Sequence, residues 1–135
     1  MIERYSRKEL KKIWSEENKY KLWLEIELAA AEAMEKINII PKGKVKKIKS
    51  KAKINVKRIL QIEKKVKHDV IAFLTSINEK VGNDGRFLHQ GMTSSDVLDT
   101  SFNLQLRSAG EIILKDINNL LKSIKSQAIK HKYSL

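Results

Sequence analysis

The chain has 135 residues, of which 41% are hydrophobic and 33% charged, so it is long enough and apolar enough to form one domain with a core. It contains no cysteine, which excludes a disulfide framework and a thiolate metal site, and its three histidines are too scattered to indicate a metal centre. No apolar run approaches the ~20 residues of a membrane span. The N-terminus lacks a signal-peptide pattern, so we expect a cytoplasmic protein with no membrane partner.

The formal net charge of +12 raises the question of nucleic-acid binding. Only five of the 28 basic residues are arginine, the side chain that phosphate and base recognition favours. The densest patch, residues 42–53, holds seven lysines, and Val45, Ile48 and Ala52 interrupt it at helical spacing. This pattern is typical of a surface helix with a solvated outer face. A small basic helical module that binds nucleic acid or associates with itself is therefore the alternative and not the favoured interpretation.

The apolar periodicity predicts an all-α fold, because no strand-like alternation with turn punctuation occurs and Pro41 is the single proline. Residues 1–8 are polar and are expected to be extended or irregular. We expect helices over residues 15–37, 42–52, 55–66, 69–81 and 95–131. Pro41 suits the first position of the second helix, Asn55 and Asp69 suit the caps of the next two, and residues 82–85 are expected to form a loop.

Two of these helices carry apolar faces that matter for the fold. The helix over 15–37 is expected to bury one face, composed of Tyr20, Trp23, Ile26, Ala30, Ala33 or Met34, and Ile37. The helix over 95–131 would span about 54 Å, whereas a compact domain of this size has a radius of gyration of only about 14 Å. Its main stripe consists of Leu106, Ala109, Ile113, Ile117, Leu120, Ile124 and Ala128. We therefore expect it to pack against further sequence or partner subunits.

The segment over residues 89–100 places a histidine, a glycine and three consecutive hydroxyls directly before the long helix. The possible caps are Thr93, Ser94 and Ser95. Thr93 with Asp96 three residues later is a capping box, and Asp96 and Asp99 are expected in the first turn. A helix N-terminus with free hydroxyls and N–H groups also suits a bound carboxylate or phosphate. The two roles are compatible, and this segment is the favoured ligand contact.

Two histidines lie at helix breaks, His68 before Asp69 and His89 before Gly91. A lone histidine is most often a structural hydrogen-bonding group or simply exposed. Because both precede expected helix starts, we expect them to face one cleft, where they donate hydrogen bonds or shift protons near a bound anion. The pattern has no nucleophile elbow, P-loop, dinucleotide fingerprint or metal-ligand cluster, so these residues alone do not make up a complete enzyme.

The N-terminal segment Arg4-Tyr5-Ser6 is a second candidate ligand contact. Arginine offers a bidentate fork to a phosphate, and tyrosine adds a hydroxyl donor. The alternative is a disordered terminus that carries an arginine by chance.

Three stretches carry a family resemblance that covers the chain in order. The first is Met1-Ile2-Glu3-Arg4-Tyr5-Ser6-Arg7, followed by Ile13-Trp14 and Trp23-Leu24-Glu25-Ile26-Glu27. The second is Lys67-His68-Asp69-Val70-Ile71-Ala72-Phe73, and the third is His89-x-Gly91-x-Thr93-Ser94-x-Asp96-Val97-x-Asp99-Thr100. Together they resemble the N-terminal portion of the bacterial adenylosuccinate lyases, within the fumarase/aspartase superfamily.

The resemblance implies a β-elimination in purine nucleotide biosynthesis that needs no cofactor and no metal. The family cleaves adenylosuccinate to AMP and fumarate, and succinyl-aminoimidazole carboxamide ribotide to its carboxamide and fumarate. Such a reaction needs a base, an acid for the leaving nitrogen and donors for the carboxylate charge. By position, the implied substrate contacts are Arg4 and Tyr5 at the nucleotide phosphate, Lys67, His68 and Asp69 at the nucleotide, and Thr93 and Ser94 at the succinyl carboxylates.

The resemblance also implies what the chain lacks. No catalytic residue is certain within it, and His68 and His89 are candidate supporting residues, since the family's Gly-Arg-Thr-His motif and catalytic serine would follow Leu135. Lys67 stands where the family often has arginine, and lysine lacks the bidentate fork. We expect residues 1–94 to form an N-terminal helical domain, and residues 95–135 the first part of a long helix of a central helical bundle. The chain looks truncated and inactive alone, and its parent is expected to be a homotetramer.

Overall fold

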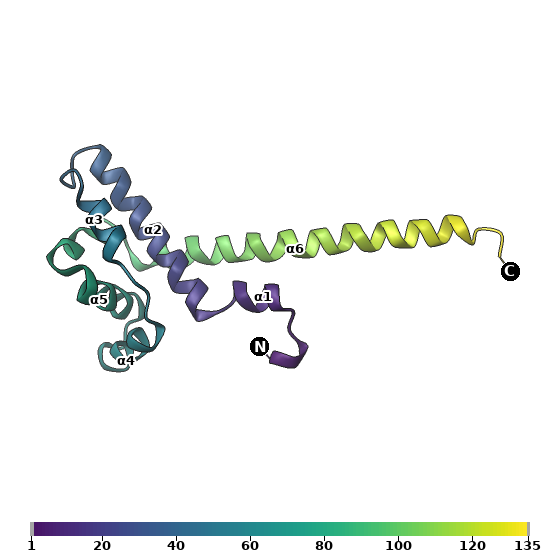
Figure 1. The fold of residues 1–135 in the computed structure, drawn as a ribbon, viewed down its shortest axis with the longest axis horizontal. Helices are drawn as coiled ribbons and strands as arrows, with labels where there is room; N and C mark the ends of the chain where they lie inside the picture. The colour runs from purple at the N-terminus through teal and green to yellow at the C-terminus, as the bar shows by residue number, and fades with distance from the viewer. Residues whose placement is uncertain (1, 135) are drawn as a thin grey trace.

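In the computed structural model, which describes residues 2–134, every regular element is helical, as the sequence predicts (Figure 1). The elements are η1 (Glu3–Tyr5), α1 (Lys8–Ile13), α2 (Glu16–Lys36), α3 (Lys44–Lys51), α4 (Val56–Val66), α5 (Asp69–Val81), η2 (Gly82–Phe87) and α6 (Ser94–Lys130). Helices α2 to α5 gather at one end into a helical head, and α6 projects away from it (Figure 1). The five predicted helices are therefore confirmed, with ends shifted by one or two residues.

The core of the head is built around three aromatic side chains from α2 and α5. Tyr20, Trp23 and Phe73 are each at most 1% exposed. The Trp23 ring lies edge-on to the other two, with centroid distances of 5.1 Å to Tyr20 and 5.5 Å to Phe73, an arrangement that aromatic rings favour. Helices α3 and α4 cover this cluster with apolar residues at helical spacing, namely Val45, Ile48, Ile59 and Ile62. The head therefore has a continuous core of its own.

The first half of α6 packs against the head and against α1. Its buried positions, Val97, Ser101, Gln105 and Ala109, recur every four residues and form one face. The Gln105 side chain donates a 2.7 Å hydrogen bond to the carbonyl of Ile13, which closes the end of α1 onto α6. Arg7 forms an ion pair with Asp116, and the Trp14 ring contacts that of Phe102. These contacts attach the N-terminal segment to the long helix.

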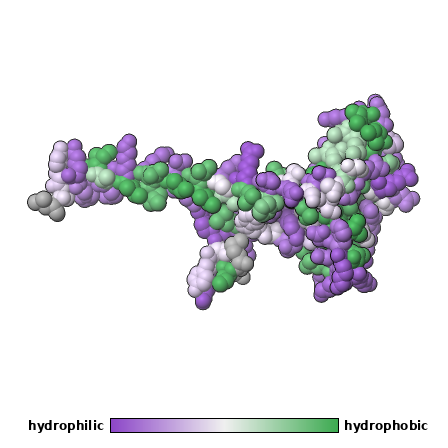
Figure 2. Space-filling view, turned by 180° about the vertical axis from the view of Figure 1, so that it is seen from behind, coloured by the Kyte–Doolittle hydropathy of each residue, from purple (hydrophilic) through white to green (hydrophobic). Residues whose placement is uncertain are grey.

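The second half of α6 is exposed from Ile113 to its end at Lys130. Hydrophobic side chains line this projecting part (Figure 2). The large ones are Ile113, Leu114, Ile117, Leu120, Leu121, Ile124 and Ile129, each between 47% and 62% exposed. At about 1.5 Å per residue the 37-residue helix is roughly 55 Å long, which agrees with the expectation that this chain cannot cover it.

One sequence prediction about the first 40 residues is wrong, and another is confirmed only in part. Within the described part of residues 1–8, η1 and the start of α1 replace the irregular segment, because tertiary contacts with α6 stabilise a helix too short to form alone. The predicted buried face of α2 is confirmed at Tyr20 and Trp23, and Ile26 and Met34 pack against the core, but the buried residues follow a different line. The buried face consists of Tyr20, Trp23, Glu27, Leu28 and Ala31, while Ile37 is 67% exposed. A buried carboxylate takes a position that the hydrophobic pattern assigns to an apolar residue.

Three predictions about helix ends are also corrected. Helix α3 begins at Lys44, three residues after Pro41, with Gly43 at the cap in a left-handed conformation. His68 and not Asp69 caps α5, because its ring nitrogen accepts from the N–H of Ile71, and Asp69 is the first helical residue. Residues 82–85, where the sequence predicts a loop, belong to the 3-10 helix η2 that follows α5. The predicted Asn55 cap of α4 is confirmed by a 3.0 Å hydrogen bond from the N–H of Arg58.

Candidate functional site

The start of α6 is built as the sequence predicts. Thr93 is the N-cap, and the carboxylate of Asp96 accepts a 2.8 Å hydrogen bond from the N–H of Thr93, one half of a capping box. Asp99 lies beyond the first turn, which corrects its predicted place. Gly91 has a positive φ of 66°, and an added Cβ would come within 3.9 Å of the Met34 side chain. The segment thus turns tightly against α2 before the helix begins.

The hydroxyl of Ser94 differs from that of Thr93 in its partners. Thr93 takes part in the capping box, whereas the Ser94 hydroxyl makes no hydrogen bond within the described residues 2–134. Ser94 is half-buried and is the first helical residue, where backbone N–H groups and the helix dipole favour a negative charge. Ser94, like the exposed Ser95 beside it, is therefore a hydroxyl of this segment that no described residue engages and that can meet an anionic ligand.

The turn between α4 and α5 contains the second group of predicted site residues. Lys67 ends α4 with a left-handed φ of 55°, a conformation that non-glycine residues adopt only at some cost. The Nδ1 atom of His68 accepts from the N–H of Ile71 at 3.4 Å, and the Asp69 carboxylate accepts from the N–H of Val70 at 2.7 Å. These two side chains thus supply hydrogen-bond acceptors to backbone N–H groups of the first turn of α5, which have no partner within the helix.

Lys67 also lines an open pocket on the outer surface of α4. The other lining residues are Leu60, Glu63 and Lys64. The negative charges of Glu63 and Asp69 lie near Tyr20 and, after its burial, are among the causes that raise the pKa of this phenol to about 12. This proximity places the start of α5 close to the aromatic core of the head.

His89, in the connector before α6, is held by a buried acid of α2. The Nδ1 atom of His89 lies 2.6 Å from Oε1 of Glu27, and the backbone N–H of His89 donates to Oε2 at 2.7 Å. Glu27 is completely buried, and the His89 side chain is 19% exposed. Because a buried carboxylate is costly unless it is hydrogen-bonded, this pair fixes the connector to the head.

Sequence reasoning missed Glu27 as a member of the site. A signal for it existed, because Glu27 falls seven residues after Tyr20 and four after Trp23, in register with the buried face of α2. An acidic residue in a core-facing stripe requires a partner. No sequence pattern names that partner, since His89 follows 62 residues later.

Arg4 and Tyr5 lie in η1 and are exposed. The Arg4 guanidinium lies over the Tyr5 ring, 4.7 Å from its centroid, and Tyr5 is 72% exposed. The two side chains therefore contact each other and face solvent, which leaves the guanidinium open to a ligand. Ser6 is engaged separately, because its hydroxyl donates to the carbonyl of Ile2.

The three predicted segments are not joined by polar or ring contacts in the part of the chain that the structure describes. Within residues 2–134, no hydrogen bond, ion pair or ring contact joins the Arg4 segment, the Lys67 segment and the Thr93 segment to one another. His68 and His89 also make no contact with each other among these residues, so the single cleft that they would share stays a prediction. The described residues contain no cluster of three acidic, histidine or cysteine side chains able to hold a metal ion.

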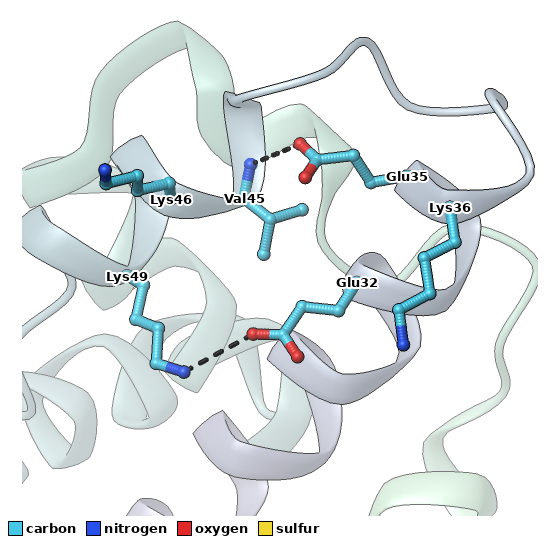
Figure 3. A pocket seen from close by; sticks show the side chains of 6 residues that line it. All are labelled: Glu32, Glu35, Lys36, Val45, Lys46 and Lys49. Atoms are coloured by element: carbon cyan, nitrogen blue, oxygen red, sulfur yellow. Dashed lines mark hydrogen bonds and ion pairs between the residues drawn. The ribbon is translucent and has the colours of Figure 1, made fainter.

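The charged groove between α2 and α3 is occupied by its own side chains (Figure 3). Glu35 of α2 accepts a 3.1 Å hydrogen bond from the N–H of Val45 and so caps α3, whose Gly43 offers no side chain. Lys49 donates to Glu32 at 3.3 Å. The lysine-rich helix is thus a surface helix whose lysines face solvent and acidic neighbours, as the sequence predicts.

The sequence and fold comparisons define the class of protein. A family model described as a lyase matches residues 3–135, and the chain belongs to this lyase family. A crystal structure of a fumarate lyase from a Mesorhizobium species superposes on 90% of this chain with a TM-score of 0.82. At 22% sequence identity, this likeness shows the fold, a helical head followed by a long helix. It covers 29% of the Mesorhizobium chain.

Three curated relatives to which the chain is plainly similar in sequence are adenylosuccinate lyases. The chain is 47% identical to an adenylosuccinate lyase of Synechocystis, 43% to that of Bacillus subtilis and 48% to that of Aquifex aeolicus. Each match covers the whole of this chain but only 31% or 32% of the relative. No helix among the described residues combines the length and apolar character that crossing a membrane requires.

Proposed function

We propose that this chain forms the N-terminal part of an adenylosuccinate lyase subunit of the cytoplasm. The enzyme cleaves adenylosuccinate to AMP and fumarate, and the related succinyl carboxamide ribotide to its carboxamide and fumarate, by β-elimination in purine nucleotide biosynthesis. The observation that carries the proposal is an identity of 43–48% with adenylosuccinate lyases over the full chain.

The chain supplies substrate contacts in this proposal. Arg4 is an exposed fork for the nucleotide phosphate, with Tyr5 beside it. Lys67, His68 and Asp69 contact the nucleotide from the α4–α5 turn. Thr93 and Ser94 hold the succinyl carboxylates, with support from the free hydroxyl of Ser94 and the positive end of α6. The remaining catalytic groups come from other parts of the subunit or from its neighbours.

The projecting half of α6 supports a homo-oligomeric assembly, with a tetramer as the expected state. Seven large hydrophobic side chains are at least 47% exposed along this half, an arrangement that soluble chains seldom leave uncovered. We infer that this half enters a bundle of helices from several subunits. Such a bundle would bring the separate substrate-contact segments of different subunits together, because they do not meet within one chain.

A chimaera tests the proposed reaction. The 135 residues replace the aligned third of the Bacillus subtilis adenylosuccinate lyase, which is 43% identical over that stretch. We expect the chimaera to release fumarate from adenylosuccinate, followed by absorbance, and the 135-residue chain alone to release none. A chimaera that folds and assembles but does not cleave adenylosuccinate would overturn the proposal. Turnover by the chain alone would contradict the inference that other segments complete the site.

A matched pair of variants in this chimaera separates ligand contact from helix capping. Ser94→Ala removes a hydroxyl that no described residue uses, so we expect an unchanged melting temperature and a kcat/KM lower by about 10–100-fold, the loss of a hydrogen bond to a charged group. Asp96→Ala breaks the 2.8 Å bond to the Thr93 N–H and lowers stability by about 1 kcal/mol. Equal kcat/KM values for Ser94→Ala and the parent would remove Ser94 from the site.

A further inference from the structure

Glu27 is a fully buried carboxylate whose two oxygens both bind one residue. Oε2 accepts from the backbone N–H of His89 at 2.7 Å, and Oε1 lies 2.6 Å from the ring Nδ1. Burial of an ionised acid is costly unless donors satisfy it, and the two His89 groups supply one donor to each oxygen. The carboxylate therefore fixes the backbone and the ring of His89 at the same time.

This geometry determines where the ring proton of His89 sits. An ionised carboxylate oxygen only accepts, so with Glu27 ionised the Nδ1 atom 2.6 Å away carries the proton of this contact. In the neutral ring, a proton on Nδ1 leaves Nε2 as a lone-pair acceptor, and in the charged ring both nitrogens are donors. In either state Nε2 is the nitrogen without a hydrogen-bond partner among residues 2–134.

The backbone of His89 adds to this constraint. Its φ of 61° lies in the left-handed region, which a residue with a Cβ enters at a cost. The hydrogen bond from its N–H to Glu27 helps hold this conformation. The imidazole is therefore locked against α2 at Nδ1, with 19% of the side chain still open.

His68 shows the opposite arrangement. Its Nδ1 accepts from the N–H of Ile71 at 3.4 Å as the cap of α5, a bond that favours a proton on Nε2 in the neutral ring, while Oδ1 of Asp69 lies 3.6 Å from the same Nδ1. The free ring nitrogen of His68 is thus a donor, while that of neutral His89 is an acceptor. We therefore expect the two candidate site histidines to hold opposite tautomers.

We propose that Glu27 is a positioning residue that fixes His89 in the Nδ1–H form and presents Nε2 to the substrate. The placement of His89 beside a substrate rests on the proposed function, whereas the tautomer is a property of the chain itself. In the lyase reaction the neutral Nε2 accepts a hydrogen bond or a proton from the substrate, and Glu27 stabilises the imidazolium that results.

Nitrogen NMR of the 135-residue chain tests the tautomer. Long-range proton–nitrogen spectra of histidine-labelled protein, at about pH 8 and above the ordinary histidine pKa of about 6.5, distinguish a protonated from a bare ring nitrogen. The His89→Gln and His68→Gln variants assign the signals. We expect a protonated Nδ1 on His89 and a bare Nδ1 on His68. A bare Nδ1 on wild-type His89 would overturn the proposal without any further variant.

The Glu27→Gln variant then tests whether Glu27 causes this tautomer of His89. The glutamine oxygen satisfies the backbone N–H of His89, which leaves its NH₂ group facing Nδ1, and a donor there moves the ring proton to Nε2. The control is Glu25→Gln on the same helix, where the exposed Glu25 lies 4.0 Å from Lys21 and does not contact His89. We expect the tautomer to switch in Glu27→Gln and to stay unchanged in Glu25→Gln. An unchanged tautomer in a folded Glu27→Gln chain would show that Glu27 does not fix it.

Enzyme kinetics test whether Glu27 affects the lyase reaction. They are measured in the complete lyase subunit that carries this segment. A positioning role predicts that Glu27→Gln lowers kcat by about 10–100-fold with a smaller change in KM and a displaced pH profile, while Glu25→Gln changes neither. An unaltered kcat would overturn the role in the reaction. A wild-type subunit that does not cleave adenylosuccinate would overturn the proposed function, and the NMR result would still decide whether Glu27 fixes His89.

Discussion

The two halves of α6 carry one continuous face but have different surroundings. In the first half, Val97, Ser101, Gln105 and Ala109 are buried at four-residue intervals against α1 and α2. The same register continues through Ile113 and Ile117 into the second half, where both are about half exposed. The helix therefore has a single packing face, of which the helical head covers one part and leaves the other part exposed.

This difference separates two kinds of stability. The head and the first half of α6 form their own core, so their folding depends on contacts within the chain. Burial of a large aliphatic side chain is worth about 1.5–3 kcal/mol, and the large hydrophobic side chains of the projecting half, each 47–62% exposed, gain only part of this within the chain. We therefore expect folding of the head and association through α6 to respond to different substitutions.

The largest expected effect is the loss of assembly when the projecting face is made polar. Ile113, Ile117, Leu120 and Ile124 are changed together to serine, and sedimentation measures the molecular mass over a range of concentrations. We expect the wild-type chain to associate and the variant to stay monomeric, because the apolar driving force has been removed. A control changes Lys115 and Lys122 to serine on the opposite face. A wild-type chain that is monomeric at all concentrations would contradict the interface.

The next largest effect is a difference between the head and the projecting half of α6 in how much one substitution lowers the free energy of unfolding. Phe73→Ala removes a side chain at the centre of the aromatic core and should lower the free energy of unfolding by about 3–5 kcal/mol. Ile117→Ala, measured in the dilute monomer, should change it by no more than about 0.5 kcal/mol. Urea denaturation followed by circular dichroism and tryptophan fluorescence compares the two. Similar losses in both variants would mean that the head and the projecting half of α6 are not independent in stability.

Sequence reasoning succeeded where local pattern decides the structure. The capping box of Thr93 and Asp96 and the Asn55 cap depend on residues three apart, and both are confirmed. It failed where distant residues decide. Helix α1 exists because Gln105 and Asp116 of the long helix bind its flanks, and the buried face of α2 is shifted by the pairing of Glu27 with His89. Neither partner lies within reach of a local pattern.

The same contrast between local patterns and distant contacts applies to the candidate site. The residue types and order of all three segments could be found in the sequence, and the structure places His68, Thr93 and Ser94 at helix starts as expected. The tautomer of His89 and the identity of its acid could not be found, because both depend on a contact across 62 residues. The relative placement of the segments could not be found either, because no hydrogen bond, ion pair or ring contact joins them among residues 2–134.

Tyr20 offers a smaller effect that is specific to the buried head. Burial, followed by the charges of Glu16, Glu63 and Asp69, raises the pKa of its phenol from 10.0 to about 12. A raised pKa favours the neutral folded form, so this contribution to stability is complete below pH 10.0 and is lost as the pH rises toward 12. Over this range we expect wild-type protein to lose stability more steeply than Tyr20→Phe. Parallel curves from alkaline urea titrations would contradict this interpretation.

The smallest expected effect comes from an ion pair near the surface of the head. Lys44 of α3 donates a 2.7 Å hydrogen bond to Asp84 of η2, and this contact, before the charges of Lys44, Lys47 and Lys51, lowers the pKa of Asp84 below its ordinary 3.8. A lowered pKa means that the stabilisation is present above pH 3.8 and is lost as the pH falls through the folded pKa. Because ion pairs at the protein surface contribute little, and this one is only partly buried, Asp84→Asn should melt slightly below wild type at neutral pH, and the difference should vanish in acid and shrink in high salt. Melting temperatures against pH test this, with Glu111→Gln in the projecting half as the control, since its pair with Arg107 connects only neighbouring turns of α6. A deficit of Asp84→Asn that persists in acid would mean that the Lys44 contact stabilises the head through packing and not through charge.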